Sequence, residues 1–570
     1  MLTQDVEKRL TRWIALGALG ITLLVTDRVS NEPVNVGKML LLVIVASASF
    51  ALTLNYYKVI WRSQKHLFLI ISLFLVFGLI SIIFSADPWE RGFYGAFGRN
   101  TGLLTYTSLS LVLLTTSFLK ESKNLYTIIR ALLITGLVNL VYCIAASQGY
   151  DVFKWKNPYH SILGTLGNPD FISAFLGIFV TALSGLIASR YFDKTKKTIL
   201  FILILDSLYV IKESMALQGY IVSAAGISII LFLYLRSIIQ KKWLLSSYLV
   251  LLGISGVVAI LGTLQKGPLA SLLYKPSVTF RGQYWHAGIS MGFHNLLHGI
   301  GLDSFGTFYR AFRRSSAAIY PGVNVVTDTS HNVFIDIFAG VGIFGFICYL
   351  ILIGFVLKAA FRIFKVQRFY DPIFSILFAT WFTYELQSFI SINQIGLAVW
   401  GWVLGGAMIA YSNITDREVQ LSKLFFTESG NSRIKKSRTK KSEPSQISAG
   451  RSLSLFLGVV LGLTIGLPPF LADVKMRQAL ESKNPDRVIS QTNSWPRDVS
   501  RTNRTIIELA NNGMMNQARK LSLESITEFP KDYASWITLY QLTPDAYKEK
   551  AAYKVKLHEL DPFNPEFIPK

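Results

Sequence analysis

Long apolar runs recur through the N-terminal two-thirds of the chain, and they constrain its fold more than any other feature. Many reach the roughly 18 residues that an α-helix needs to cross about 30 Å of hydrocarbon. Only 16% of the residues are charged and 51% are hydrophobic, whereas a soluble domain usually carries about 25% charged residues. The pattern therefore predicts an all-α polytopic membrane protein.

We expect about 12 transmembrane helices and one further helix that leads to a small α-helical repeat domain. Lys212 and Glu213 mark the turn between the seventh and eighth helices. The twelve are expected at about residues 12–26, 37–55, 66–84, 102–119, 127–146, 170–190, 197–211, 215–235, 243–264, 331–357, 371–390 and 395–412, and the further one at 452–473.

The net charge of +23 would indicate a nucleic-acid partner in a soluble protein. Here most lysines and arginines lie in short loops between apolar runs, where they set the orientation of the helices. With the N-terminus inside, every second loop carries the excess of positive charge, as membrane topology requires. This alternation predicts that the loop at about 265–330 lies on the outer face. No nucleic acid is expected to bind.

Two further segments follow the predicted membrane domain, residues 1–412. Residues 413–451 are polar and basic, which predicts a disordered cytoplasmic linker that also attracts anionic lipid. Residues 474–570 have a soluble composition, and "WPRD" at 495–498 and "FPKD" at 529–532 are 34 positions apart. That period is typical of tetratricopeptide repeats. The helix count places this domain outside, where it is a candidate for recruiting a protein partner.

Two outer stretches carry candidate substrate-binding residues. Arg99, in "GAFGRNTG", follows glycines that let a backbone approach a ligand closely, and its guanidinium suits phosphate oxygens. The plainer interpretation is an arginine that reaches to lipid headgroups. Asn168, in "GNPDF", begins a helix together with Pro169 and Asp170, so capping explains most of this motif and substrate contact is the alternative.

The third stretch, residues 277–314, is amphipathic, aromatic and basic. Arg281 and Trp285 are four residues apart and therefore share a helix face. A second basic patch follows the glycine-rich "HGIGLDSFG", and its residues Arg310, Arg313 and Arg314 are further candidates for substrate binding. Three of the seven histidines also lie here, but no cysteine or carboxylate completes a ligand set, so we expect neither a metal nor a cofactor.

The fourth stretch, "TDTSHNVFIDIFAG", enters the tenth predicted membrane helix. We expect His331 to begin that helix, capped by one of the residues 328–330, with Asp336 orienting the imidazole. A neutral imidazole can take a proton from a hydroxyl, and guanidiniums stabilise a departing pyrophosphate. Together they suit the transfer of a sugar chain from a membrane-bound lipid pyrophosphate to an acceptor hydroxyl.

The motifs "TFRGQYWHAG", "GIGLDSFG" and "SHNVFIDIFAGVGIFG", in this order, resemble the O-antigen ligase and O-antigen polymerase superfamily. The resemblance implies a twelve-helix, metal-independent glycosyltransferase of the bacterial cytoplasmic membrane that uses an undecaprenyl-pyrophosphate-linked glycan. It assigns activation of the acceptor to His331, pyrophosphate binding to Arg281 and a further phosphate contact to Arg99. The chain departs from the family at Gln218-Gly219, where members often carry an arginine.

Several functions remain open at this stage. The acceptor is a lipid, a growing polymer or a protein, which correspond to a ligase, a polymerase and an oligosaccharyltransferase. A transporter or flippase for lipid-linked glycan is the alternative of another class, because Asp206, Glu213 and Glu385 lie in or near membrane helices. The clustering of arginine and histidine at the outer face favours the enzyme over the transporter and over a scaffold.

Overall fold

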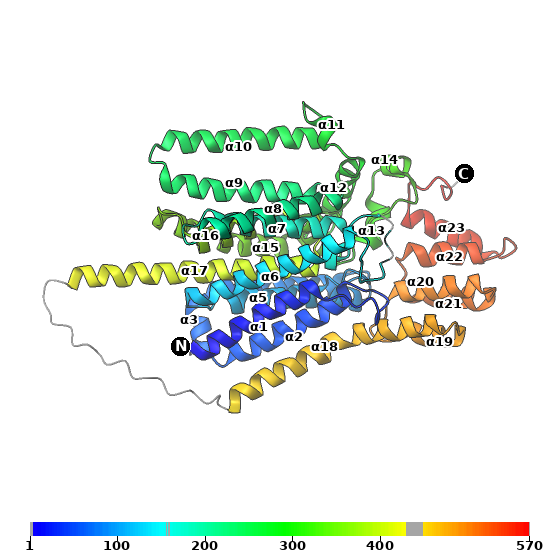
Figure 1. Ribbon diagram of the computed structural model, residues 1–570. Helices are drawn as coiled ribbons and strands as arrows, with labels where there is room; N and C mark the ends of the chain where they lie inside the picture. Colours follow the sequence, from blue (N-terminus) through cyan, green and yellow to red (C-terminus); the bar gives the residue numbers. More distant parts are fainter. Residues whose placement is uncertain (1–3, 156, 158–159, 429–448, 569–570) are drawn as a thin grey trace.

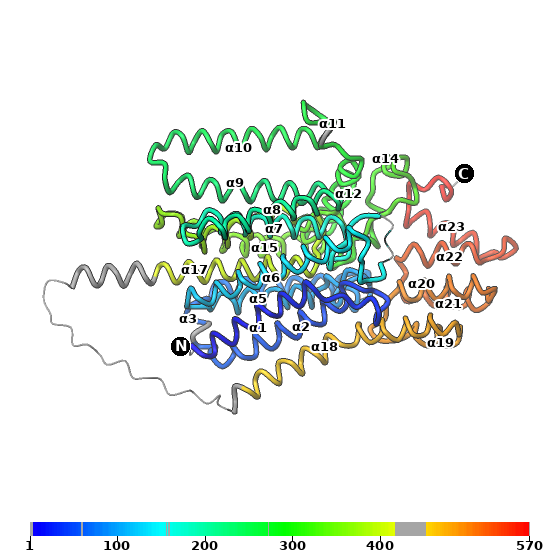
Figure 2. The backbone as a smooth tube through the Cα atoms, in the orientation of Figure 1, coloured from blue at the N-terminus to red at the C-terminus, as the bar shows by residue number. Residues whose placement is uncertain are grey.

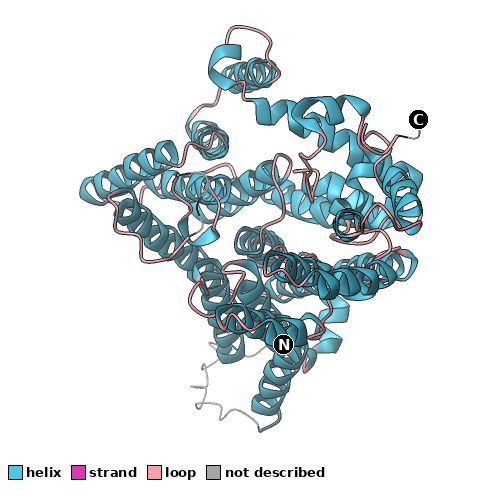
Figure 3. Ribbon diagram, turned by 90° about the vertical axis from the view of Figure 1, so that its right-hand side faces the viewer, coloured by secondary structure: helices cyan, strands magenta, loops and turns pink. Residues whose placement is uncertain are grey.

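The computed structural model describes residues 4–155, 157, 160–428 and 449–568, and within these ranges every regular element is a helix (Figure 3). The all-helical prediction is therefore confirmed, and each expected segment is helical. The long helices are α1 Gln4–Leu23, α2 Asn35–Leu54, α3 Tyr57–Phe84, α5 Leu103–Thr116, α6 Ser122–Ser147, α7 Pro169–Ile187, α8 Lys194–Glu213, α9 Gln218–Ile238, α10 Lys242–Thr263, α15 Val333–Val366, α16 Pro372–Ser388, α17 Ile395–Glu428 and α18 Ala449–Glu481.

The long helices lie side by side in one bundle (Figure 1). Nine helices in the described ranges are long and apolar enough to cross a membrane. The number of crossings, and which end of the bundle faces outside, stay predictions. Asp371 illustrates how these helices begin, since its carboxylate accepts hydrogen bonds from the first turn of α16.

The boundaries of the expected linker, residues 413–451, need correction. Helix α17 continues to Glu428 and α18 begins at Ala449, so the first part of this stretch is helical rather than disordered. The sequence from 413 to 428 contains neither proline nor glycine and is rich in helix-forming residues, which explains the extension. Residues 429–448 lie outside the described residues. Helix α18 also continues beyond the expected end at 473, to Glu481.

Helix α18 runs along α2, so the segment after the linker returns to the N-terminal helices (Figure 1). Three glycines four residues apart, Gly458, Gly462 and Gly466, face α2. A Cβ atom on Gly462 would lie 2.6 Å from the Cα atom of Ile44. Such small residues allow two helix backbones to approach closely in a membrane.

Replacing Gly462 by leucine is expected to lower the thermal stability of the detergent-solubilised protein, because the α2 backbone must move to accept the side chain. Overpacking of this kind costs about 1–3 kcal/mol. The matched control is Gly253→Leu in α10, where a Cβ atom meets nothing within 4 Å. Equal melting temperatures for the two variants would contradict this packing.

The C-terminal helices stack in sequence at one end of the bundle, and each packs on the next (Figure 2). They are α19 Pro485–Thr492, α20 Val499–Asn511, α21 Met515–Glu528, α22 Tyr533–Leu542 and α23 Glu549–Leu560. The repeated "WPRD" and "FPKD" motifs place Asp498 and Asp532 as N-caps of α20 and α22. The repeated motif therefore encodes two capped helix starts that are 34 residues apart. A tetratricopeptide array stays a prediction.

The same end of the bundle carries the segment between α10 and α15, whereas α1 begins at the opposite end (Figure 1). This segment contains the short helices α11 Ala270–Leu273, α13 Phe305–Phe312 and α14 Ser315–Ala317 and the longer α12 Pro276–His294. The 265–330 loop and the C-terminal helices therefore share one end of the bundle.

Candidate functional site

His331 lies just before α15, and the expected helix start is wrong. The helix begins at Val333, and its N-cap is Asn332, whose side-chain oxygen accepts hydrogen bonds from the backbone N–H groups of Phe334 (3.0 Å) and Ile335 (3.2 Å). None of residues 328–330 caps this helix. Asn332 has the extended backbone that an N-cap requires, which places its side chain above the first turn.

The backbone of His331 is left-handed, with φ of 57°, a conformation that costs free energy for a non-glycine residue and is enriched at functional sites. Its N–H donates to Thr329 Oγ1 (3.2 Å), and its imidazole stacks on the Tyr284 ring of α12, with centroids 5.7 Å apart. Asp336 was expected to orient the imidazole. Its carboxylate instead accepts from the Ser330 N–H (2.8 Å), so Asp336 fixes the loop.

Arg281 projects from α12 beside the start of α7. Its Nη2 atom lies 3.4 Å from Asp170 Oδ2, and Asp170 is its only hydrogen-bonding partner among the described residues. Asn168 caps α7 by accepting from the Asp170 N–H (2.9 Å), which confirms its capping role. Arg281 therefore keeps N–H groups for a ligand, whereas Asn168 acts through the helix start that presents Asp170.

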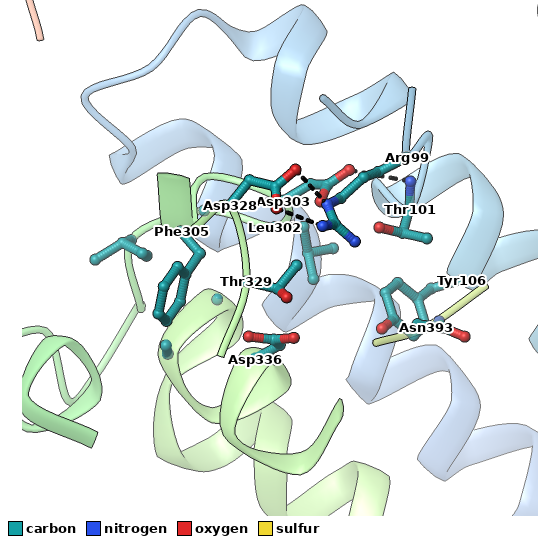
Figure 4. Close-up of a pocket in the computed structure, with 14 residues that line it drawn as sticks. Arg99, Thr101, Tyr106, Leu302, Asp303, Phe305, Asp328, Thr329, Asp336 and Asn393 are labelled. Carbon is teal, nitrogen blue, oxygen red and sulfur yellow. Dashed lines mark hydrogen bonds and ion pairs between the residues drawn. The ribbon is translucent and has the colours of Figure 1, made fainter. Parts of the chain in front are cut away.

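Arg99 faces the loop that leads to His331. Its guanidinium pairs with both carboxylate oxygens of Asp328, with Nε 2.6 Å from Oδ2 (Figure 4). The Arg99 loop is in turn shaped by Asp303, whose carboxylate accepts from the N–H groups of Ala96 (2.8 Å) and Thr101 (3.1 Å). Burial raises the pKa of Asp303, although the arginines nearby oppose this shift.

The cavity that Arg99 lines, together with Asp303, Asp328 and Asp336, is small (Figure 4). Its volume of about 30 Å³ has room for one or two water molecules and not for a sugar. The cavity is thus a small polar gap in the contact between the loop that carries Arg99 and α15. Arg281 and His331 do not line this cavity and are partly exposed, so a larger ligand can reach them from outside it.

The electrostatic environment keeps His331 neutral. Burial lowers its pKa, and the positive charges of Arg281 and Arg99 lower it further, to about 4, against a smaller opposing effect of Asp328. The contacts agree with this, because His331 stacks on Tyr284, one turn of α12 after Arg281, and Arg99 binds Asp328, three residues before His331. The structure therefore gathers three of the expected residues, His331, Arg281 and Arg99, at one place.

Two arginines of the second basic patch, expected to bind substrate, bind a carboxylate of the protein instead. Arg313 is fully buried, and its Nη2 atom donates to both oxygens of Asp561, each at 2.7 Å. Arg310 binds the same carboxylate at 2.9 Å and lies over the Tyr533 ring. These two arginines join the loop to the C-terminal helices and are not open to substrate, which corrects their assignment. Arg314 is exposed and stays a candidate.

Sequence reasoning missed Asp303, Asp328 as the partner of Arg99, and Asp561. The first had a signal, because an aspartate among the positive-φ glycines Gly299 and Gly301 suggests a structured turn. The others had none, since their partners are 229 and 248 residues away. No group of three histidine, cysteine or acidic side chains in the described ranges is arranged to hold a metal.

Fold and site together define a polytopic membrane protein, helical throughout the described ranges, with a histidine and two arginines gathered at one end of its bundle. Residues 199–350 match the family model described as O-antigen ligase, a segment that includes Arg281 and His331 and excludes Arg99. The match supports the O-antigen ligase superfamily and a membrane enzyme of the ligase or polymerase type. No curated protein matches the chain.

Proposed function

We propose that the protein is a metal-independent glycosyltransferase that moves a glycan from undecaprenyl pyrophosphate to an acceptor hydroxyl at the outer face of the bacterial cytoplasmic membrane. The observation that carries the proposal is the arrangement of three side chains: His331 stacks on Tyr284, one turn of α12 after Arg281, and Arg99 binds Asp328, three residues before His331. The match over residues 199–350 supports it independently.

The reaction needs one proton acceptor and stabilisation of one leaving group. His331 takes the proton of the acceptor hydroxyl as its oxygen attacks the anomeric carbon of the donor sugar. The bond between that carbon and the pyrophosphate oxygen breaks, and the lipid pyrophosphate leaves with the bonding electrons. Arg281 and Arg99 are the donors that stabilise the resulting negative charge.

The carboxylate partners position these arginines. Asp170 contacts Arg281 at 3.4 Å, a weak ion pair that a phosphate can replace, and Asp328 holds Arg99 by two contacts. Arg281 is therefore the primary pyrophosphate ligand, and Arg99 mainly adds positive electrostatic potential at the leaving group. Since a bound pyrophosphate neutralises positive charge beside His331, donor binding raises the pKa of the imidazole and makes it a stronger base.

Because donor binding raises the pKa of His331, the pH profiles of kcat/KM and of kcat are expected to differ. The neutral form of His331 is active, so kcat/KM, which reports the free enzyme, is expected to fall only as pH drops towards the pKa of about 4. The acid limb of kcat, which reports the donor complex, is expected at higher pH. Initial rates of glycan transfer between pH 4 and 8 measure both. An acid limb of kcat/KM near 6.5 would show that the imidazole is unperturbed.

The acceptor and the role of the C-terminal helices belong to the same proposal. Through Asp561 these helices contact the loop that leads to His331, so a partner or acceptor bound to them would lie near the reacting groups. This placement supports a role in acceptor delivery. Ligation to a lipid is the primary candidate; repeat-unit polymerisation and protein glycosylation are the alternatives within the superfamily.

The test is reconstitution of the purified protein with undecaprenyl-pyrophosphate glycan and separate lipid, polymer and protein acceptors, with chelator present. Transfer to one acceptor supports the proposal and identifies the reaction. A flippase would move intact lipid-linked glycan between the leaflets of sealed vesicles without transfer to any acceptor. That result would overturn the enzyme.

A further inference from the structure

A larger cavity lies at the opposite end of the bundle from His331, where α3 begins and α15 ends. Its volume is about 470 Å³, large enough for a phosphate-bearing headgroup. Residues of three helices line it: 61–67 of α3, Phe355, Lys358, Ala359 and Arg362 of α15, and Ile409, Ser412 and Asn413 of α17. It shares no residue with the proposed catalytic site.

The lining is strongly basic. Arg62 and Lys65 come from α3, and Lys358 and Arg362 come from α15, so four cations from two separate helices surround one hollow. Arg362 has a carboxylate neighbour, Asp416, at 3.8 Å between exposed side chains, which is a weak pair. Membrane orientation alone accounts for basic residues in loops, but it does not require them to meet around a cavity.

The wall of the cavity also contains a buried hydroxyl group that makes no hydrogen bond to the described residues. Ser412 on α17 is 1% exposed, and its hydroxyl has no hydrogen-bond partner among the described residues. The hydroxyl oxygen has less than 1 Å² of accessible surface, so a ligand oxygen reaches it only when the side chain turns towards the cavity. Gln64, also in the lining, interrupts the helical geometry of α3 at this level.

The position of the cavity at the ends of candidate membrane spans indicates that such a ligand comes from the bilayer. Three candidate membrane spans end around it: Trp61–Phe84, Val333–Val366 and Ile395–Asp416. Trp61 is exposed, and the Lys65 ammonium lies 5.8 Å from its ring centroid. Exposed tryptophan and lysine at the ends of spans are typical of the headgroup layer of a bilayer.

We propose that this cavity binds the phosphate of an anionic phospholipid headgroup. The four cations supply the charge, and the Ser412 hydroxyl supplies a donor once its side chain turns towards the cavity. Basic pockets between membrane helices recognise anionic headgroups in this way. The site is separate from the proposed glycan transfer, and its test does not depend on that activity.

The experiment measures lipid binding to the purified full-length protein in nanodiscs by native mass spectrometry and thermal unfolding. Phosphatidylglycerol is titrated into phosphatidylcholine discs. The test variant is Arg62→Gln with Lys358→Gln, and its matched control is Lys241→Gln with Lys242→Gln, two exposed cations at the start of α10, outside the cavity. Each cation contributes roughly 1 kcal/mol, so the test variant should bind about 30-fold more weakly.

A loss confined to the test variant supports the site, and Ser412→Ala should weaken binding without adding or removing charge. Equal loss in the control pair would mean that general surface charge attracts the lipid, which overturns the proposal. Inorganic phosphate forms the remaining arm. If phosphate alone stabilises the protein as well as phosphatidylglycerol does, the ligand is a soluble anion and the lipid assignment fails.

Discussion

Replacing His331 by alanine is expected to reduce glycan transfer by roughly 100- to 10,000-fold, the range that general base catalysis contributes. The reason is that the imidazole, whose pKa is lowered by burial and by Arg281 and Arg99, is the proposed acceptor of the proton. Initial rates with purified lipid-linked donor measure the loss. Replacing Arg281 by alanine should give a similar loss, while lysine, which cannot bind phosphate through two parallel donors, should restore only part of the activity.

The matched control for His331 is His294→Ala, an exposed histidine at the end of α12 whose Nδ1 contacts only its own helix. Its transfer rate should equal that of the unmodified protein. Melting temperatures of the variants show whether the fold survives. Full activity of folded His331→Ala protein would remove this residue from the mechanism.

Replacing Asp561 by asparagine is expected to release the C-terminal helices from the loop that contains α13. Arg313 would then be a buried cation without its carboxylate, a change that typically costs about 3–5 kcal/mol. Arg310 would lose the same partner. Hydrogen exchange of residues 305–323 and 533–560 measures the release, and faster exchange in both segments is the expected result.

The surface pair of Asp545 and Lys550 provides the comparison, because the Asp545 side chain is 96% exposed. Asp545→Asn should leave exchange in both segments unchanged. If Asp561→Asn also leaves exchange unchanged, the contact does not hold the C-terminal helices in place.

The fold was largely predictable because its signals are local. Each long helix is an apolar run that can be recognised without knowing its neighbours. The start of α15 shows the limit of this reasoning, since several polar residues precede it and the backbone conformation selected Asn332. Likewise, the extension of α17 to Glu428 follows from helix propensity in a stretch that its charges made look disordered.

The sequence allowed residue types to be proposed for the candidate site, but it did not reveal their pairings. The chemistry of His331, Arg281 and Arg99 suits a lipid pyrophosphate. Arg313 has the same chemistry, but it forms a structural ion pair with Asp561. Nothing in the sequence signals this pair, because Asp561 lies 248 residues further along the chain. A guanidinium that binds phosphate and one that binds a buried carboxylate look alike until the partner is known.

The contact between Arg313 and Asp561 also constrains whether the chain crosses the membrane an even or an odd number of times between these two residues. Two residues can touch only if they lie on the same side of the membrane, so the chain between them must cross an even number of times. Three candidate spans lie between them: Val333–Val366, Ile395–Asp416 and Ser452–Glu481. The remaining helix of this part, α16, has 17 residues and is about 25 Å long. A crossing by α16 would make the count even, so the ion pair favours the prediction that this short helix spans the bilayer.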